Sequence, residues 1–166
     1  TSFNQPLDSW NTKKVTDMIA AFAKTTVFGQ PLNSWDTGSV TTMKGLFEEA
    51  AAFNGALDSW NTTKVLDMEQ TFYSASAFDQ PVDSWDTAKV LRMATTFGQL
   101  DAFDQKLDSW QTSSVSTMQG MFAGSRVFDR SLNSWDTSSV LAMDGMFQSA
   151  LAFNGRLDSW NTTKVK

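Results

Sequence analysis

Apolar residues recur along the chain at fixed positions of a 25-residue period. The tryptophans mark that period without interruption: Trp10, Trp35, Trp60, Trp85, Trp110, Trp135 and Trp160. In the first period they are accompanied by Phe3, Leu7, Val15, Met18 and Phe22, and by Thr12. A fixed period of this length is typical of a repeat architecture in which each unit buries its apolar side against its neighbours. We therefore expect the recurring positions, the tryptophans above all, to form the core and the variable positions to face water.

The spacing of these positions predicts two elements in each repeat. From Val15 to Phe22 the apolar residues are three and then four apart, which predicts a helix of about two turns. Three glycines at the centre of that helix in other repeats would weaken it by about 1 kcal/mol each. From Leu7 to Thr12 the spacing is that of a leucine-rich-repeat strand, which predicts one short parallel strand.

Together these elements predict an α/β repeat solenoid that is leucine-rich-repeat-like, with one short strand and one short helix per repeat. The alternative is a mainly-β solenoid. We expect residues 1–166 to form a single array of about six and a half repeats. Neither end shows the polar capping repeat that such arrays need, so the sequence predicts a longer chain or a filament.

Composition excludes several classes of function. The net charge of −5 leaves no basic surface for nucleic acid, and no apolar run is long enough for direct membrane insertion. The chain has no cysteine and no histidine, which removes thiolate metal sites and the commonest general base. We accordingly predict no catalytic residue, no cofactor and no metal site, and hence no enzyme.

The predicted strand presents two polar columns to solvent, at repeat positions 9 and 11. In the central repeats these are Ser34, Asp36, Ser59, Asn61, Ser84, Asp86, Ser109, Gln111, Ser134 and Asp136. Alternation of amide and carboxylate along position 11 separates like charges, which favours a purely structural role. The alternative is a ligand surface for glycans. Calcium is disfavoured, because carboxylates on every second strand would be about 9.6 Å apart.

Two further patterns carry hypotheses. The threonine column that begins at Thr12 would suit an ice-binding solenoid if it faced outward, but the strand assignment places it inside. Asn61 and Asn161 lie in N-x-T sequons, and we predict that they are glycosylated if the source secretes the chain through a eukaryotic pathway.

The sequence F-N-Q-P-L-D-S-W-N-T from Phe3, followed by V-T-D-M and a phenylalanine four residues later, resembles a known bacterial repeat. It is similar to the repeats of BspA-like bacterial surface proteins and mycoplasma-type lipoproteins. The resemblance implies an extracellular or cell-surface array used for adhesion or structural display, and it implies no catalytic residues.

The function that we expect is therefore a non-enzymatic structural or adhesive surface protein, a rigid rod or filament component. A carbohydrate- or ligand-binding module is the alternative. The expected partners are further repeats or further copies of the chain at both ends, together with glycans or host and cell-surface proteins.

Overall fold

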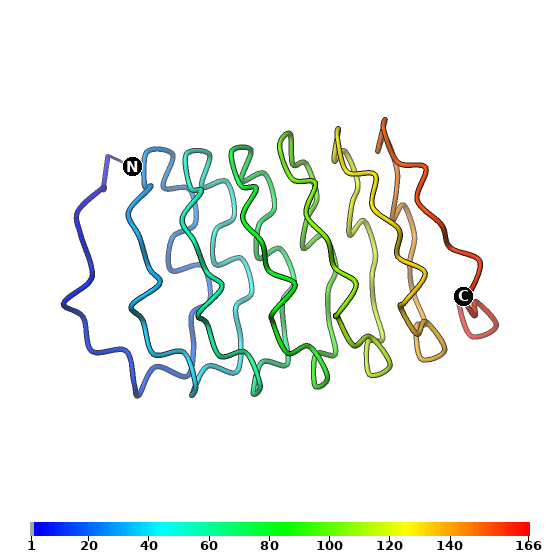
Figure 1. The fold of residues 1–166 in the computed structure, drawn as a ribbon, viewed down its shortest axis with the longest axis horizontal. Helices are drawn as coiled ribbons and strands as arrows, with labels where there is room; N and C mark the ends of the chain where they lie inside the picture. The colour runs from blue at the N-terminus through cyan, green and yellow to red at the C-terminus, as the bar shows by residue number, and fades with distance from the viewer. Residues whose placement is uncertain (1) are drawn as a thin grey trace.

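The chain forms a stack of layers, one layer for each 25-residue repeat (Figure 1). A computed structural model describes residues 2–166 and places the N-terminal and C-terminal ends at opposite ends of the stack. Each repeat makes one circuit, so that a residue lies beside its equivalents in the layers before and after it. Below, a repeat position means a residue of the first layer and its equivalents at 25-residue intervals.

The predicted strand and helix are both wrong, and with them the α/β assignment. Residues 2–166 contain no helix, and their parallel pairing is limited to isolated bridges such as Asp17 with Thr42. The mainly-β alternative fails for the same reason. In place of the strand, the amide of Trp10 donates to the carbonyl of Leu7 at 3.0 Å, which closes a turn.

The segment from Val15 to Phe22, predicted as a helix, is instead part of a run of overlapping turns. Amides at odd positions close these turns within a layer, as when Ala21 donates to Met18 at 3.2 Å. Amides at even positions donate to the next layer, as when Met18 donates to Thr42 at 3.1 Å. In these turns Val15, Met18 and Phe22 still pack into the core, and their spacing of three and then four is the one that a helix face also gives.

Four amides in each layer donate forward in this way, at positions 18, 20, 22 and 24. They reach the carbonyls of positions 17, 19, 21 and 23 in the following layer, and this arrangement is present between every pair of layers from Met18 to Gln148. A fifth column runs in the opposite direction: the amide of Thr41 donates back to the carbonyl of Thr16 at 2.8 Å.

The turns need a left-handed backbone at positions 20 and 24. Gly45, Gly120 and Gly145 have φ values of 57° to 61°, and Ala20, Gln70 and Thr95 adopt the same conformation at the same position. Glycine takes up this conformation without a steric penalty. The glycines that would weaken a helix are therefore the favoured residues in the structure that forms.

Aromatic rings form three continuous columns in the core. Trp60 and Trp85 stack with ring centroids 6.2 Å apart, and Phe47 and Phe72 stack at 5.7 Å. Phe53, from the third column, packs on Phe47 at 3.9 Å. The tryptophans of the inner layers are buried, whereas Trp10, in the first layer, is 59% exposed.

Each tryptophan from Trp35 onward also binds the layer before it. Its indole N–H donates to the carbonyl at position 7 of that layer, as from Trp60 to Leu32 at 3.0 Å. A buried indole thus keeps a hydrogen-bond partner. Two further core positions, 21 and 25, were not predicted from the sequence; Leu46 and Ala50 are fully buried there.

Candidate functional site

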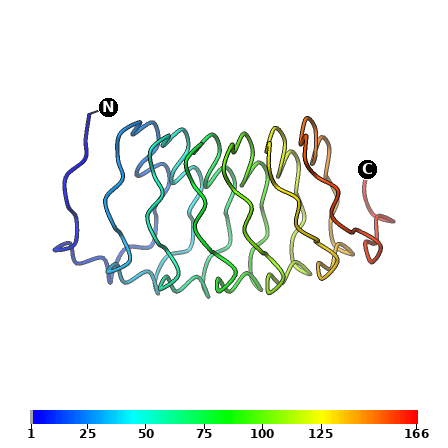
Figure 2. The same cartoon turned by 45° about the horizontal axis from the view of Figure 1, so that its top comes forward.

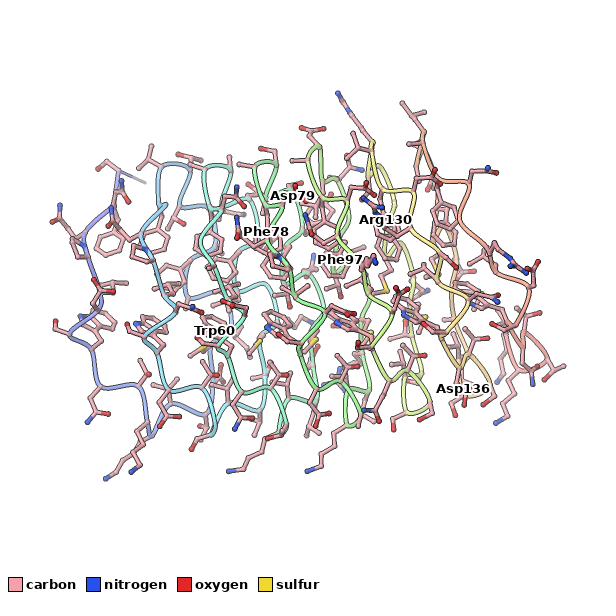
Figure 3. All side chains as sticks on the ribbon, in the orientation of Figure 1. Trp60, Phe78, Asp79, Phe97, Arg130 and Asp136 are labelled. Carbon is pink, nitrogen blue, oxygen red and sulfur yellow. The ribbon has the colours of Figure 1, made fainter. Side chains whose placement is uncertain are left out.

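The ten residues of the predicted ligand surface are all exposed. They lie in and just after the turn that position 10 closes with position 7, before the turn that position 15 closes with position 12. The structure therefore brings positions 9 and 11 to one surface that runs along the stack, although turns and not strands place them there. In Figure 3, Asp136 lies toward the lower edge of the view.

Side chains at position 11 cap their own turns. A carboxylate or amide oxygen accepts the backbone N–H two residues later, from Gly38 to Asp36 at 3.1 Å and from Thr63 to Asn61 at 3.1 Å. Both Asp and Asn supply this acceptor, as is usual for such turns. The alternation of amide and carboxylate therefore leaves the local geometry unchanged.

One of these carboxylates shows the effect of the turn on its acidity. Hydrogen bonds from the hydroxyl and then the amide of Ser138 lower the pKa of Asp136, with a smaller contribution from the charge of Lys164. Hydrogen bonds to the charged form favour ionisation. Asp136 is fully exposed, so this concerns its protonation and gives no measure of its contribution to stability.

Several serines at position 9 join neighbouring layers, among them Ser59, Ser84 and Ser109. The hydroxyl of Ser59 donates to the carbonyl of Asn33 at 2.6 Å, and that of Ser109 donates to the carboxylate of Asp83 at 2.9 Å. Among residues 2–166, many side-chain hydrogen bonds join residues 24 to 28 positions apart. This polar column therefore holds layers together as well as facing water.

Gln111 interrupts the surface. Within residues 2–166 its side-chain amide has no hydrogen-bond partner, whereas Asp86 and Asp136 in the adjacent layers cap their turns. An open hollow of about 380 Å³ lies beside it. The hollow is lined by Asp108, Ser109, Trp110, Gln111, Thr112, Ser113, Ser134 and Asp136. It combines hydroxyl, amide and carboxylate groups that a polar ligand could contact.

The threonine column is inside the stack. Thr87 is fully buried; its hydroxyl donates to the carbonyl of Gln111 at 3.0 Å and accepts the amide of the same residue at 2.8 Å. Thr37, Thr62, Thr112 and Thr137 are buried in the same way. This column cannot form a flat outer surface against ice.

Both sequon asparagines are exposed. Their side-chain oxygens accept hydrogen bonds from the hydroxyls of Thr63 and Thr163, at 2.7 and 2.8 Å respectively. The two sites have the same geometry, 100 residues apart. Glycosylation at Asn61 and Asn161 stays a prediction.

A further polar column, at position 4, was not predicted from the sequence. The side chain of Asp79 accepts the amide of Asp104 at 3.1 Å, and Asp104 accepts the amide of Asp129 at 3.1 Å. Arg130 reaches back to Asp104 at 2.7 Å. Figure 3 labels Arg130 and, two layers before it, Asp79 of this column. The repeated Asn or Asp at position 4 was the available signal, because a column so regular in sequence marks a repeated contact. Gly29 is its one interruption.

Ion pairs also link the layers. Lys44 pairs with Glu69 at 2.8 Å, and this hydrogen bond raises the pKa of Lys44. Arg92 pairs with Asp67, whose side chain is almost fully buried, at 2.9 Å. Each of these pairs is 25 residues apart in sequence, so charge at the surface contributes to register between repeats.

In the part of the chain that the structure describes, no group of three or more acidic side chains is placed to hold a metal ion. The same residues include no helix with the length and hydropathy of a membrane span.

The sequence matches one protein family. A family described as Mycoplasma protein of unknown function, DUF285, matches residues 1–110 and again residues 77–166. The chain belongs to this family. The two matched segments overlap and together cover the whole chain, which confirms a repeat protein related to the mycoplasma repeats that the sequence resembles. No curated protein and no solved structure matches the chain.

Proposed function

We propose that the chain is a non-enzymatic structural repeat protein that forms a stiff rod at a cell surface. The observation that carries the proposal is the unbroken set of contacts between layers. Four forward amide bonds, an indole bond and three ring columns recur at successive junctions. Nothing in the middle of the stack interrupts them.

The polar surface supports a structural role over an enzymatic one. Asp36, Asp86 and Asp136 hold turns. Ser59, Ser84 and Ser109 bond to the preceding layer. A catalytic site brings unlike groups together at one place, whereas these groups repeat with the period. The cell-surface location rests on the resemblance to bacterial surface repeats and on membership of the Mycoplasma family.

The location can be tested on intact cells that produce the protein. Antibodies against the chain should label intact and permeabilised cells equally. Labelling that appears only after permeabilisation would reject a surface rod. Negative-stain images of the purified chain should show straight particles elongated along one axis, as in Figure 1.

An adhesive role can be separated from a purely structural one by changing charge without changing the turns. Asp36→Asn, Asp86→Asn and Asp136→Asn together remove three charges and keep the side-chain acceptor that each turn uses. We expect unchanged folding and unchanged attachment of the cells if the rod is structural. Loss of attachment with an intact fold would assign this face to a ligand.

A polysaccharide ligand is the second candidate, because Gln111 breaks the column beside the hollow. Planar amides and carboxylates suit sugar hydroxyls. Titration of soluble glycans into labelled protein should then shift the amide signals of residues 108–113. Gln111→Ala should abolish the shifts, and Gln119→Ala, at repeat position 19, should preserve them. Unchanged spectra across a broad glycan set would reject this candidate.

A further inference from the structure

The repeat changes locally in the fifth and sixth layers, and Figure 2 shows further layers on both sides of them. In earlier layers the amide at position 3 closes a turn with the carbonyl three residues before it, as from Phe78 to Ala75 at 2.9 Å. Phe103 and Phe128 close no such turn within residues 2–166. The carbonyl that Phe103 would use belongs to Leu100, which is buried at position 25. The other residues at that position are smaller: Thr25, Ala50, Ala75, Ser125 and Ala150.

A surface hollow of about 330 Å³ lies in this part of the stack. It is lined by residues at positions 4 to 8 of three successive layers: Pro81, Asp83, Asp104, Gln105, Lys106 and Arg130. It shares no lining residue with the hollow beside Gln111. Its volume falls at the lower end of the range of about 300–1,000 Å³ that is usual for small-molecule sites.

Two cations distinguish this hollow from the same surface in an earlier part of the stack. Lys106 occupies position 6, where proline is the commonest residue, and Arg130 occupies position 5, where glutamine is the commonest. Two layers earlier the equivalent positions are uncharged: Pro31, Asn33, Asn54, Gly55, Ala56 and Gln80. Contacts that build the rod repeat with the period. These two cations do not, so they need a separate explanation.

The carboxylates of the hollow are already engaged by the protein. Asp83 accepts the amide of Ser109 at 2.8 Å on one oxygen and its hydroxyl at 2.9 Å on the other. Asp104 accepts the amide of Asp129 at 3.1 Å and Nη2 of Arg130 at 2.7 Å, again on different oxygens. Each carboxylate oxygen therefore has one protein donor and keeps the capacity to accept a second hydrogen bond.

The cations, by contrast, keep unused donors. The ammonium group of Lys106 contacts no acceptor within residues 2–166, and Nη1 of Arg130 donates to none there. Both residues are exposed. Gln105 donates from Nε2 to the side chain of Asp79 at 2.8 Å, which leaves its Oε1 as an unused acceptor. The hollow thus offers N–H donors on cations for an anion, and oxygen acceptors for hydroxyl groups.

We propose that this hollow binds an acidic saccharide. A singly charged carboxylate or sulfate of the sugar accepts hydrogen bonds from Lys106 and Arg130, because ammonium and guanidinium groups pair strongly with such oxyanions. Sugar hydroxyls donate to Oε1 of Gln105 and to the spare acceptor capacity of Asp83. Pro81 adds an apolar edge, as is common in ligand sites. This site goes beyond the structural role of the rod.

The charges of the hollow favour this class of ligand over others. Two cations and two carboxylates balance, so the hollow accommodates one added negative charge. A doubly charged phosphate would meet Asp83 and Asp104 at close range, where like charges repel. An acidic peptide brings several like charges and few hydroxyls, and the chain as a whole carries a charge of −5 that repels it.

The variants that test the site restore residues that the repeat itself uses. Lys106→Pro introduces the residue of Pro81, and no hydrogen bond is lost because the amide of Lys106 donates to no acceptor within residues 2–166. Arg130→Gln introduces the residue of Gln105, whose side chain also bonds to the layer before it. Unchanged tryptophan fluorescence and melting will show that the double variant is folded.

The matched control removes two positive charges outside the hollow. Lys64→Ser with Lys89→Ser places serine at position 14, where Ser39 and Ser114 already occur. The control variant has the same net charge as the double variant. Any difference in binding between the two therefore comes from the position of the charges.

Calorimetric titration should use a galacturonate oligosaccharide, a chondroitin sulfate oligosaccharide, a neutral malto-oligosaccharide and a glutamate peptide as probes. We expect an acidic saccharide to bind the parent protein and the control, more weakly as salt is added. The double variant should bind about tenfold or more weakly, which corresponds to about 1.4 kcal/mol or more. The tighter of the two acidic saccharides identifies carboxylate or sulfate as the preferred group.

Equal binding by the double variant and the parent would overturn the proposal, as would the absence of binding by both acidic saccharides. Equally tight binding of the neutral sugar would exclude a role for the cations, and tighter binding of the glutamate peptide would assign the hollow to a protein partner instead.

A second measurement locates the ligand on the unmodified protein. In isotope-labelled protein the acidic saccharide should shift the amide signals of residues 104–106 and 130 and leave the equivalent residues 54–56 and 80 unchanged. Shifts confined to other layers would reject this site. Neither experiment bears on whether the chain is a surface rod, which the labelling of intact cells decides.

Discussion

The buried threonine column predicts a specific loss of stability for Thr87→Val. Valine keeps the shape of the side chain but removes the hydroxyl that both donates to and accepts from the backbone of Gln111. Each such bond contributes about 0.5–1.5 kcal/mol net. Loss of two should lower the free energy of unfolding by about 1–3 kcal/mol.

Thr112 provides the matched comparison in the adjacent layer. It is equally buried, yet its hydroxyl makes one bond, donating to the carbonyl of Asp136 at 2.9 Å. Thr112→Val should therefore cost about 0.5–1.5 kcal/mol, half the effect of Thr87→Val. Thr87→Ser, which keeps the hydroxyl, should recover most of the loss.

Urea unfolding followed by tryptophan fluorescence measures these differences. For a chain of this size about 1 kcal/mol corresponds to roughly 2–4 °C in melting temperature, so a loss of about 1–3 kcal/mol should lower the melting temperature of Thr87→Val by about 2–12 °C. If both valine variants lose the same stability, or if Thr87→Val is as stable as the parent, the hydroxyls do not join the layers and the reasoning fails.

Three other outcomes follow from single features. Gly29→Asn restores the missing acceptor in the position 4 column, and an added Cβ there meets only ordinary contacts. This variant should raise the free energy of unfolding in urea by about 0.5–1.5 kcal/mol. A destabilised variant would contradict the role of the position 4 column in joining layers. Thr95 and Gly120 both have positive φ, so Thr95→Gly should stabilise the fold and Gly120→Ala should destabilise it by about 1–2 kcal/mol. A lower melting temperature for Thr95→Gly than for Gly120→Ala would refute the turn assignment. Because the pKa of Asp136 is lowered, any stability from its ionised form is present above the usual carboxyl pKa and is lost as pH falls through the lowered pKa. Ser138→Ala should raise the pKa of Asp136 in an NMR titration. An unchanged midpoint would rule out the hydroxyl of Ser138 as the cause.

The sequence predicted the repeat and its core better than the backbone that builds them. Phe, Trp and Met at fixed intervals showed which side chains are buried, because burial depends on pattern. The route of the chain depends on where each amide finds its acceptor. Met18 and Phe22 have helical spacing, yet their amides donate to Thr42 and Leu46 in the next layer. No pattern within a single repeat shows that partner.

The polar face was predicted to be exposed, and the serines and aspartates are exposed. Their contacts were not predicted, because an acceptor such as Asn33 lies 26 residues from the Ser59 that it binds. The positive φ values were also missed. Gly45 could have indicated a left-handed backbone at position 20, but Gln70 and Thr95 at the same position hide the preference for glycine.

The forward amide columns give the stack an electrical polarity. Each peptide group carries a dipole of about 3.5 D, and in an α-helix the aligned groups add. Here four columns point toward the C-terminal end and one points back, so four minus one, three, are uncompensated. The C-terminal end is therefore partially positive and the N-terminal end partially negative. Two such rods lying side by side attract when they run antiparallel and repel when they run parallel.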